Sequence, residues 1–274
     1  MAPSPAAPRV TVAMVVHGGL EVTRACLESL RATTEPFTLT VVDNGSLDDT
    51  PRFFAEFRLP FPLRYVRNAT NGSVLAAYNQ AWRLADTEFV CLLHNDTVML
   101  EPRWLERLLA PHAERETGLT GLYGAKHVRR DGRYAARSLA HSLADGPCVR
   151  APFEEVAAVD GVCLCVRRSL LEEVGGFDEA YGFFHGYDRD LSFAVRERGR
   201  RCYVVAAPFH HRGGATRTRA FTSEPEAERR DLELRRAAMQ RFSEKYAHRL
   251  PCDVRGLGAR VADWLGRPLG RRRG

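Results

Sequence analysis

Three consecutive polar side chains, His94, Asn95 and Asp96, follow the apolar run FVCLL at residues 89–93. A buried strand that ends in an imidazole and a carboxylate can hold a divalent cation. Hard oxygen ligands suit Mg²⁺ or Mn²⁺, and an imidazole shifts the preference towards Mn²⁺. Many strands simply end in polar residues, so the surrounding segments must decide between a metal site and an ordinary strand end.

Two further polar segments follow apolar runs. In VVDNGS, Asp43 is placed to accept hydrogen bonds from a nucleobase or ribose, although Asn-Gly followed by Ser is also typical of a turn. In HHRGGAT, His210 and His211 precede two glycines that let the backbone approach a ligand closely. Each histidine is a candidate metal ligand, and the alternative is a structural or exposed imidazole.

The segment GGFDEAYGFFHGYDRDLSFAVRERG, residues 175–199, contains the other carboxylates of interest. Asp188 and Asp190 open a predicted helix, whose N-terminus stabilises negative charge, so capping accounts for one of them. The aromatic residues around them can raise the pKa of a carboxylate towards the range of a general base. We therefore expect one of the two to have a catalytic role.

The elements that must position these residues alternate along the first hundred residues. Apolar, β-branched runs predict strands, and apolar residues at helical spacing predict helices between them, one of which starts with Pro51. Strands that are apolar throughout and separated by helices predict a parallel sheet covered on both faces, which binds ligands beyond the carboxyl ends of its strands. The predicted strands cover 10–16, 39–44, 63–67 and 89–93, and the helices include 20–32 and 74–85.

The second half is less regular. We expect a helix at 102–115 and then short strands and loops to about residue 150, followed by a strand at 159–168. A short helix that ends at Gly175, an amphipathic helix at 188–199 and a long charged helix from Ser223 to about Ala247 come next. The C-terminal tail is basic.

Composition sets weaker limits. The 274 residues are 45% hydrophobic, which is enough for one large or two small α/β domains. A net charge of +6 favours acidic partners. The seven cysteines form no CxxC pair and mostly lie in apolar runs, so buried free thiols are expected rather than disulfides or zinc ligands. There is no signal peptide pattern and no apolar run of roughly 18 residues, which predicts a cytoplasmic protein.

Together, the order and spacing of these motifs resemble the family 2 glycosyltransferases of GT-A fold, in particular a bacterial rhamnosyltransferase-like branch. The similarity extends from about Val10 to Thr216. Its motifs are CLESL at 26–30, VVDNGS at 41–46, the Asn71 to Asn79 segment, LLHNDT at 92–97, GGFDE at 175–179, YDRDLSFAVR at 187–196 and HRGGAT at 211–216.

The resemblance implies a fold and a domain division. It implies an α/β, GT-A (Rossmann-like) architecture with a mixed, mainly parallel central sheet flanked by helices, and a C-terminal helical extension. Residues 1–9 would be disordered, and residues 10–221 would form the glycosyltransferase domain. Within it, 10–100 would bind the nucleotide and 101–221 the acceptor, while 222–274 would form a helix and a basic tail.

The resemblance also assigns site residues. Asp96 would be the direct ligand of Mn²⁺ or Mg²⁺, with His211 and His94 beside it and His210 in reserve, and Asp188 would be the catalytic base. A UDP-, GDP- or dTDP-sugar donor would contact a set of residues at the strand ends and nearby loops, namely Val16, His17, Asp43, Asn71, Asn79 and Asn95.

Four residues depart from the family pattern. His94 replaces the first residue of the metal motif, and Tyr187 replaces a glutamate before the catalytic aspartate. Ser73 stands at a usual glycine, and His17 at a usual tyrosine. The residues that the chemistry needs most, Asp96 and Asp188, are present.

The implied activity is metal-dependent, inverting transfer of a sugar to an acceptor hydroxyl in polysaccharide, glycolipid or other glycoconjugate biosynthesis. The acceptor would be a glycan, a lipid-linked molecule or a small molecule. Nucleic acid is not an expected partner, and membrane contact would be peripheral at most, at the inner face. The alternative is a non-catalytic nucleotide-sugar-binding or scaffolding protein of the same fold. A nucleotidyltransferase fits poorly, because VVHGGLEVTR is a poor match to a glycine-rich phosphate loop.

Overall fold

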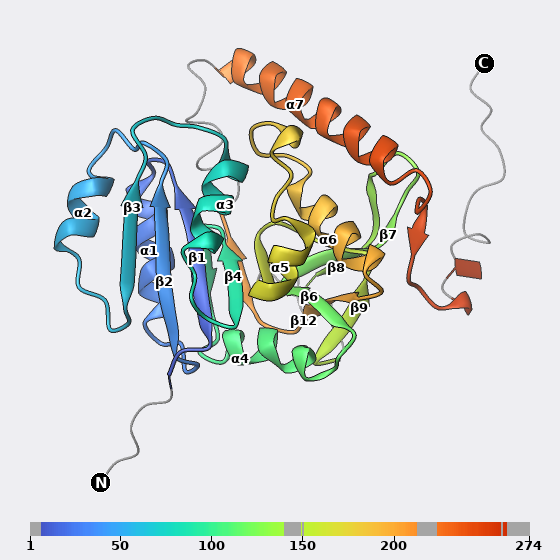
Figure 1. Ribbon diagram of the computed structural model, residues 1–274, viewed down its shortest axis with the longest axis horizontal. Coiled ribbons are helices and arrows are strands. Elements are labelled where there is room, and N and C mark those ends of the chain that lie inside the picture. Colours follow the sequence, from blue (N-terminus) through green and yellow to red (C-terminus); the bar gives the residue numbers. More distant parts are fainter. Residues whose placement is uncertain (1–6, 140–148, 150, 213–223, 259, 262–274) are drawn as a thin grey trace, which may run out of the picture.

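The computed structural model describes residues 7–139, 149, 151–212, 224–258, 260 and 261. A central sheet of eight strands runs through the protein in the order β3-β2-β1-β4-β11-β6-β12-β9. Figure 1 shows helix α1 behind the first strands and α3 in front of them, so that both faces of this part of the sheet are covered. The mixed, mainly parallel sheet that we expected is confirmed.

The first four strands pair in parallel with one another, as the sequence predicts. Their registers align Val16 with Asp43 and Asp43 with Arg67, so the carboxyl ends of three strands lie at one edge of the sheet. The elements of this N-terminal half are β1 Val10–Val16, α1 Leu20–Leu30, β2 Phe37–Asp43, α2 Thr50–Glu56, β3 Leu63–Arg67, α3 Val74–Arg83 and β4 Phe89–Leu93.

The uninterrupted run of parallel strands predicted for the first hundred residues ends at β4. Its next neighbour, β11 (Cys163–Arg167), pairs antiparallel with both β4 and β6 (Thr117–Gly121). A parallel pair needs a crossover connection, which is usually a helix. β11 is preceded by the short strand β10 (Ala158–Val159) and not by a helix, and it joins the sheet antiparallel.

The weakly patterned middle of the chain forms short strands, as expected. A small second sheet contains β10-β7-β14, with β8 paired to β7. These strands and their neighbours are β7 Tyr123–Val128, β8 Tyr134–Leu139, β9 Phe153–Val156, β12 Arg201–Val205 and β14 Cys252–Asp253. The segment predicted as one strand at 159–168 contains the end of β10 and all of β11, separated by Asp160, Gly161 and Val162.

The helix expected at 102–115 is shorter in the structure. α4 spans Trp104–Leu109 and continues as a 3₁₀ turn over Ala110–Ala113. Pro111 explains the change, because proline has no N–H to donate and its ring disfavours the α-helical interior.

The long charged helix is confirmed as α7, Glu224–Lys245, which crosses the top of the view in Figure 1. Arg241 contacts Asp178 at 2.8 Å, and Phe242 packs edge-on against Phe193 of α6. The remaining helices of this half are α5 Arg168–Val174, the 3₁₀ turn η2 Glu179–Tyr181 and α6 Tyr187–Glu197.

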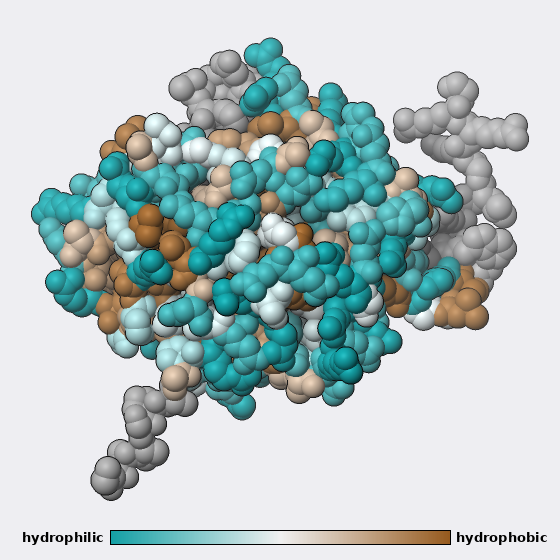
Figure 2. Space-filling model, viewed as in Figure 1, coloured by the Kyte–Doolittle hydropathy of each residue, from teal (hydrophilic) through white to brown (hydrophobic). Residues whose placement is uncertain are grey.

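Buried apolar side chains from both halves form one continuous core. The six described cysteines are free thiols, and five of them are buried. The face seen in Figure 2 is largely hydrophilic where α7 and α5 cover it. Among the described residues, no helix combines the length and the apolar character needed to cross a bilayer. Of the predicted tail after the long helix, residues 248–258, 260 and 261 are described, and the rest lies outside the described part of the chain, as do residues 1–6.

Candidate active site

A cavity of about 1010 Å³ opens at the carboxyl ends of β1, β2 and β4. Side chains from both halves line it, including residues of the β7–β8 hairpin, the start of α6 and α7. The structure brings eight of the ten candidate site residues to its walls: Val16, His17, Asn71, His94, Asn95, Asp96, Asp188 and His211. Asp43 and Asn79 are not among the lining residues.

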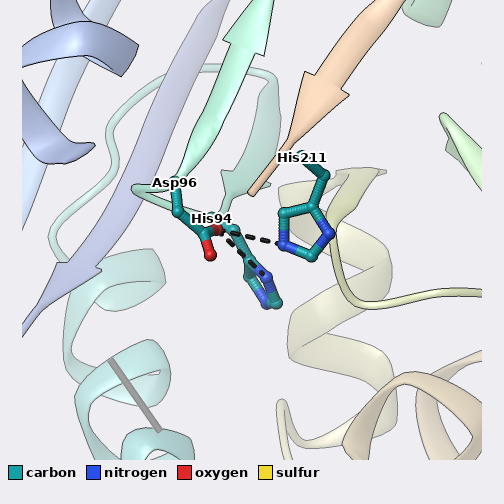
Figure 3. Close-up of side chains that lie close together, drawn as sticks. All are labelled: His94, Asp96 and His211. Atoms are coloured by element: carbon teal, nitrogen blue, oxygen red, sulfur yellow. Dashed lines mark ion pairs between the residues drawn. The ribbon is translucent and has the colours of Figure 1, made fainter. Parts of the chain in front are cut away.

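Two short strands bring His211 next to the end of β4. β13 (Phe209–His211) pairs antiparallel with β5 (Thr97–Met99), and His211 lies opposite Thr97. The Nε2 atom of His211 is 3.1 Å from Oδ1 of Asp96, and Nδ1 of His94 is 4.0 Å from the same oxygen. Figure 3 shows the two imidazole rings on the same side of the Asp96 carboxylate. Alternation along β13 leaves His210 exposed and outside the cavity lining, so His211 is the better placed of the two.

This group fits a divalent cation. One ligand atom from each of His94, Asp96 and His211 lies within 4.8 Å of the others. The Nε2 atom of His211 is buried, and its close contact is with Oδ1 of Asp96, without the geometry of a good hydrogen bond. Two ligand atoms of one cation approach each other in this way, and a ligand there would satisfy the buried nitrogen. One carboxylate oxygen with two imidazole nitrogens suits Mn²⁺ or Mg²⁺, with the imidazoles favouring Mn²⁺.

The protonation states also suit a metal. Burial and the neighbouring His211 lower the pKa of His94, so its ring is neutral at physiological pH. Burial opposes ionisation of Asp96, but contact with His211 and the two nearby imidazoles hold its pKa below the usual range. A neutral imidazole and an ionised carboxylate are the forms that coordinate a cation.

Asp188 lies at the start of α6 and is buried, with 6% of its surface exposed. Tyr134 donates a hydrogen bond to its Oδ2 at 3.2 Å, and Arg189 contacts its Oδ1 at 3.4 Å. The guanidinium of Arg189 also stacks over the ring of Tyr134, 3.9 Å from its centroid. These contacts orient the carboxylate in the cavity wall.

Asp190 has a different environment, which the sequence could not separate from that of Asp188. Its Oδ1 accepts hydrogen bonds from Tyr181, Tyr246 and Lys245. It therefore anchors α7 to α6 and does not line the cavity.

Asp160 was missed by the sequence analysis. It lines the cavity between β10 and β11, and its Oδ1 accepts a hydrogen bond from the backbone N–H of Val162. Burial and the charge of Asp188 raise the pKa of Asp160 to about 6. The Asp-Gly pair is an ordinary turn signal, and only its place between two apolar runs sets it apart. Tyr134 lies outside every motif, and Arg189 lies within the motif at 187–196 but was given no role there.

The candidate donor contacts divide into two groups. Val16, His17 and Asn71 face the cavity, as does Asn95, which donates to Thr23 at 2.8 Å. Asp43 is fully buried beside them. It accepts hydrogen bonds from the N–H of Ser46 and the hydroxyl of Tyr65, and so shapes the turn after β2. Its neighbour Asn44 lines the cavity instead and donates to Asn71.

Asn79 joins the two halves of the protein. Its side-chain oxygen accepts hydrogen bonds from the backbone N–H of Phe177 and the indole N–H of Trp82. Its amide nitrogen donates to the carbonyl of Phe177 and to Glu179. A direct contact with a donor would require some of these bonds to break.

Comparisons with known proteins agree with this arrangement. The family described as Glycosyl transferase family 2 matches residues 11–175. The uncharacterized protein y4gI of Sinorhizobium fredii is 27% identical over 251 residues, which cover 82% of this chain and 27% of that protein. The O-antigen biosynthesis protein RfbC of Myxococcus xanthus is 26% identical, over 81% of this chain and 18% of RfbC. The chain thus spans about a quarter or less of the length of these two relatives.

Among solved structures, the mannosyltransferase PcManGT from Pyrobaculum calidifontis, in complex with GDP-Man and Mn²⁺, superposes with a TM-score of 0.56. The match has 20% sequence identity and covers 96% of this chain and 80% of that one. At this level of identity the likeness establishes a shared fold, and the roles of individual residues rest on the geometry of the cavity.

Proposed function

Because this chain belongs to glycosyl transferase family 2, we propose that it transfers a sugar from a nucleotide-sugar donor to an acceptor hydroxyl, with inversion at the anomeric carbon. The observation that carries this proposal is that one cavity joins two groups of side chains. His94, Asp96 and His211 come from the turn between β4 and β5 and from β13, and the Asp188 carboxylate comes from the start of α6.

The metal-binding group and Asp188 have complementary tasks. A bound Mn²⁺ or Mg²⁺, held by Asp96 with His211 and His94, would neutralise charge that develops on the departing nucleoside diphosphate. Val16, His17, Asn71 and Asn95 would hold the donor at the strand ends, beside that ligand group. Asp43, under the same edge, would support them through the turn that ends in Ser46.

Asp188 acts on the acceptor. As the acceptor oxygen bonds to the anomeric carbon, the bond from that carbon to the diphosphate breaks and the hydroxyl proton passes to Asp188. Tyr134 and Arg189 contact the two oxygens of this carboxylate and hold it in place. A single displacement inverts the configuration and needs no second nucleophilic carboxylate.

Likeness to known proteins supports a nucleotide sugar as the donor and a polysaccharide or other glycoconjugate as the product. PcManGT was solved with GDP-Man, and the name of RfbC refers to O-antigen biosynthesis. We propose a UDP-, GDP- or dTDP-sugar as the donor and a glycan, a lipid-linked molecule or a small molecule as the acceptor. The enzyme would be a hexosyltransferase of the rhamnosyltransferase-like branch.

A second candidate is a non-catalytic nucleotide-sugar-binding protein. The observation that favours it is the pair of departures at His94 and Tyr187, both of which lie in the cavity wall. The buried Asp188, with its oriented carboxylate, favours the enzyme.

The deciding experiment follows nucleoside diphosphate release from a panel of UDP-, GDP- and dTDP-sugars with Mn²⁺, Mg²⁺ or EDTA. Each donor is tested alone and with mixed acceptors. Metal-dependent release from one donor, lost in Asp188→Asn, is the expected result. Donor binding measured by calorimetry, without release under any condition, would favour the non-catalytic candidate. No binding of any nucleotide sugar would refute both.

A further inference from the structure

His94 has a second partner on the side of its ring away from Asp96. Its Nε2 atom lies 2.9 Å from the hydroxyl oxygen of Tyr187, the first residue of α6. That hydroxyl donates a hydrogen bond to the backbone carbonyl of Gly161, 3.3 Å away. The chain of contacts therefore links the end of β4 to α6 and to the loop before β11.

The direction of these hydrogen bonds determines which nitrogen of His94 carries the proton. A tyrosine hydroxyl has one proton, and a carbonyl can only accept. If Tyr187 donated to an unprotonated Nε2 instead, it would give up its hydrogen bond to Gly161. We therefore assign the arrangement that keeps both bonds, in which Tyr187 donates to Gly161 and accepts from Nε2–H of His94. The Nδ1 atom is then unprotonated, and its lone pair faces the side of the ring that lies 4.0 Å from Asp96.

The surroundings hold Tyr187 in this place. Its side chain is buried, and its ring packs against those of Tyr78 and Phe177, with centroids 5.5 Å and 5.7 Å away. Gly161 leaves the room that the hydroxyl needs, because a Cβ at that position would lie 2.1 Å from the Tyr187 oxygen. Side-chain packing and the glycine together orient the hydroxyl towards His94.

We infer that Tyr187 is a positioning residue for the metal site: it presents Nδ1 of His94 to the cation that Asp96 and His211 would hold. This inference rests on the metal site of the proposed function. It also relates two departures from the family pattern, His94 and Tyr187, which lie in hydrogen-bond contact. Outer partners of metal-ligating histidines set the tautomer and orientation of the ring in this way.

The first test is a Mn²⁺ titration, in which free Mn²⁺ is followed by its electron paramagnetic resonance signal. Tyr187→Phe keeps the ring packing and removes the hydroxyl, so Mn²⁺ affinity should fall roughly 10- to 100-fold. The matched control is Tyr181→Phe, which loses a hydrogen bond to Asp190 outside the cavity lining and should leave the affinity unchanged. Equal affinity in wild type and Tyr187→Phe would overturn the inference.

A double-mutant cycle separates an effect through His94 from a general packing effect. In a His94→Ala background the imidazole is gone and no new partner for the Tyr187 hydroxyl is introduced, so Tyr187→Phe should cause no further loss of Mn²⁺ affinity. The same loss in both backgrounds would overturn the inference. Gly161→Ala, which displaces the hydroxyl from the other side, should reproduce the Tyr187→Phe loss.

Nitrogen NMR of metal-free protein with ¹⁵N-labelled histidine reads the tautomer directly. Wild type should show His94 protonated at Nε2, and Tyr187→Phe should show a mixture of tautomers. A mixture already present in wild type would overturn the inference. If wild type bound no Mn²⁺ but kept the single tautomer, the metal part of the proposed function would fail, together with the inferred role at the cation. Tyr187 would then still orient the ring.

Discussion

The N-terminal half of the protein, residues 10–100, and the C-terminal half reach the same cavity by different constructions. In the N-terminal half, parallel strands with aligned carboxyl ends bring Val16, His94 and Asp96 to one edge. In the C-terminal half, Tyr134, Asp160 and Asp188 come from a hairpin, a connection between strands and a helix start. The N-terminal half repeats a strand followed by a helix, whereas the arrangement in the C-terminal half depends on contacts between segments that are distant in the sequence.

The difference teaches where each kind of function resides. Repeated strand ends form a surface for phosphate, nucleoside and metal, because every parallel strand delivers its polar residues to the same edge. The residues around the base come together only when the C-terminal half folds onto this edge. A change at the strand ends of the N-terminal half should therefore affect donor and metal binding, whereas a change at Asp188 should affect proton transfer. His211 and Tyr187 are the C-terminal residues that reach the metal group.

The largest effect is expected for Asp188→Asn. Loss of a general base slows the chemical step by about 10²- to 10⁴-fold. Donor affinity, measured by calorimetry, should stay close to that of wild type. Asp190→Asn is the matched control on the same helix: it removes a carboxylate that anchors α7 and should lower stability while the folded protein remains active. Equal loss of donor binding and transfer in Asp188→Asn would contradict the division of tasks.

The next largest effect is expected for Asp96→Asn, in the N-terminal half. This change removes the carboxylate that lies closest to both imidazoles. Mn²⁺ affinity should fall by more than the roughly 10- to 100-fold typical of an outer partner. Calorimetric titration of Mn²⁺ measures this directly. Asp48→Asn, in the loop after β2, serves as the control, and an equal loss there would show that general charge, and not coordination, holds the ion.

Asn79→Ala should weaken the join between the halves. The substitution leaves the N–H and C=O of Phe177 and the indole N–H of Trp82 without their partner, in a buried position. Two or three such losses cost about 2–4 kcal/mol of unfolding free energy. Urea unfolding measures the cost, with the exposed Arg52→Ala as a control near zero. Unchanged stability with weakened donor binding would instead assign Asn79 to the donor, as the sequence motif suggested.

The smallest effect is expected for Asp160→Asn, and it depends on pH. Folding raises the pKa of Asp160 from about 3.8 to about 6, so the folded state binds its proton more tightly than the unfolded chain. The stability that this group contributes is present below pH 3.8 and is lost as pH rises through 6.

Asparagine keeps the shape of Asp160 without the charge. At pH 8 the variant should therefore melt at a higher temperature than wild type, by roughly 2–4 °C for each kcal/mol gained. At pH 4 the gain should be much smaller. Calorimetric scans at both pH values test this prediction, and a gain that did not depend on pH would show that the carboxyl group is not protonated on folding.

Much of the fold could be predicted from local patterns. The first four strands and their helices follow from apolar runs and helical spacing, and both predicted strand ends, at Asp43 and Asp96, lie at the same edge. These features depend on residues close together in the sequence. The direction of β11 depends instead on the strand beside it, β4, which lies seventy or more residues earlier in the chain.

The candidate site shows the same limit. His94, Asp96, Asp188 and His211 were found because motifs name them, and the structure brings them to one cavity. Asp160 and Tyr134 lie outside the motifs, and Arg189 lies within one without an assigned role. Asp43 and Asn79 carry a signal but are buried and do not line the cavity.

By itself the sequence determined the strand and helix order of the N-terminal half, the family, and which residue types stand at the strand ends. Only the tertiary structure decided which of Asp188 and Asp190 faces the cavity, which of His210 and His211 meets Asp96, and that Tyr187 contacts His94. The physical reason is that periodicity depends on neighbours along the chain. The direction and partner of a side chain depend instead on the packing of segments that the sequence keeps far apart.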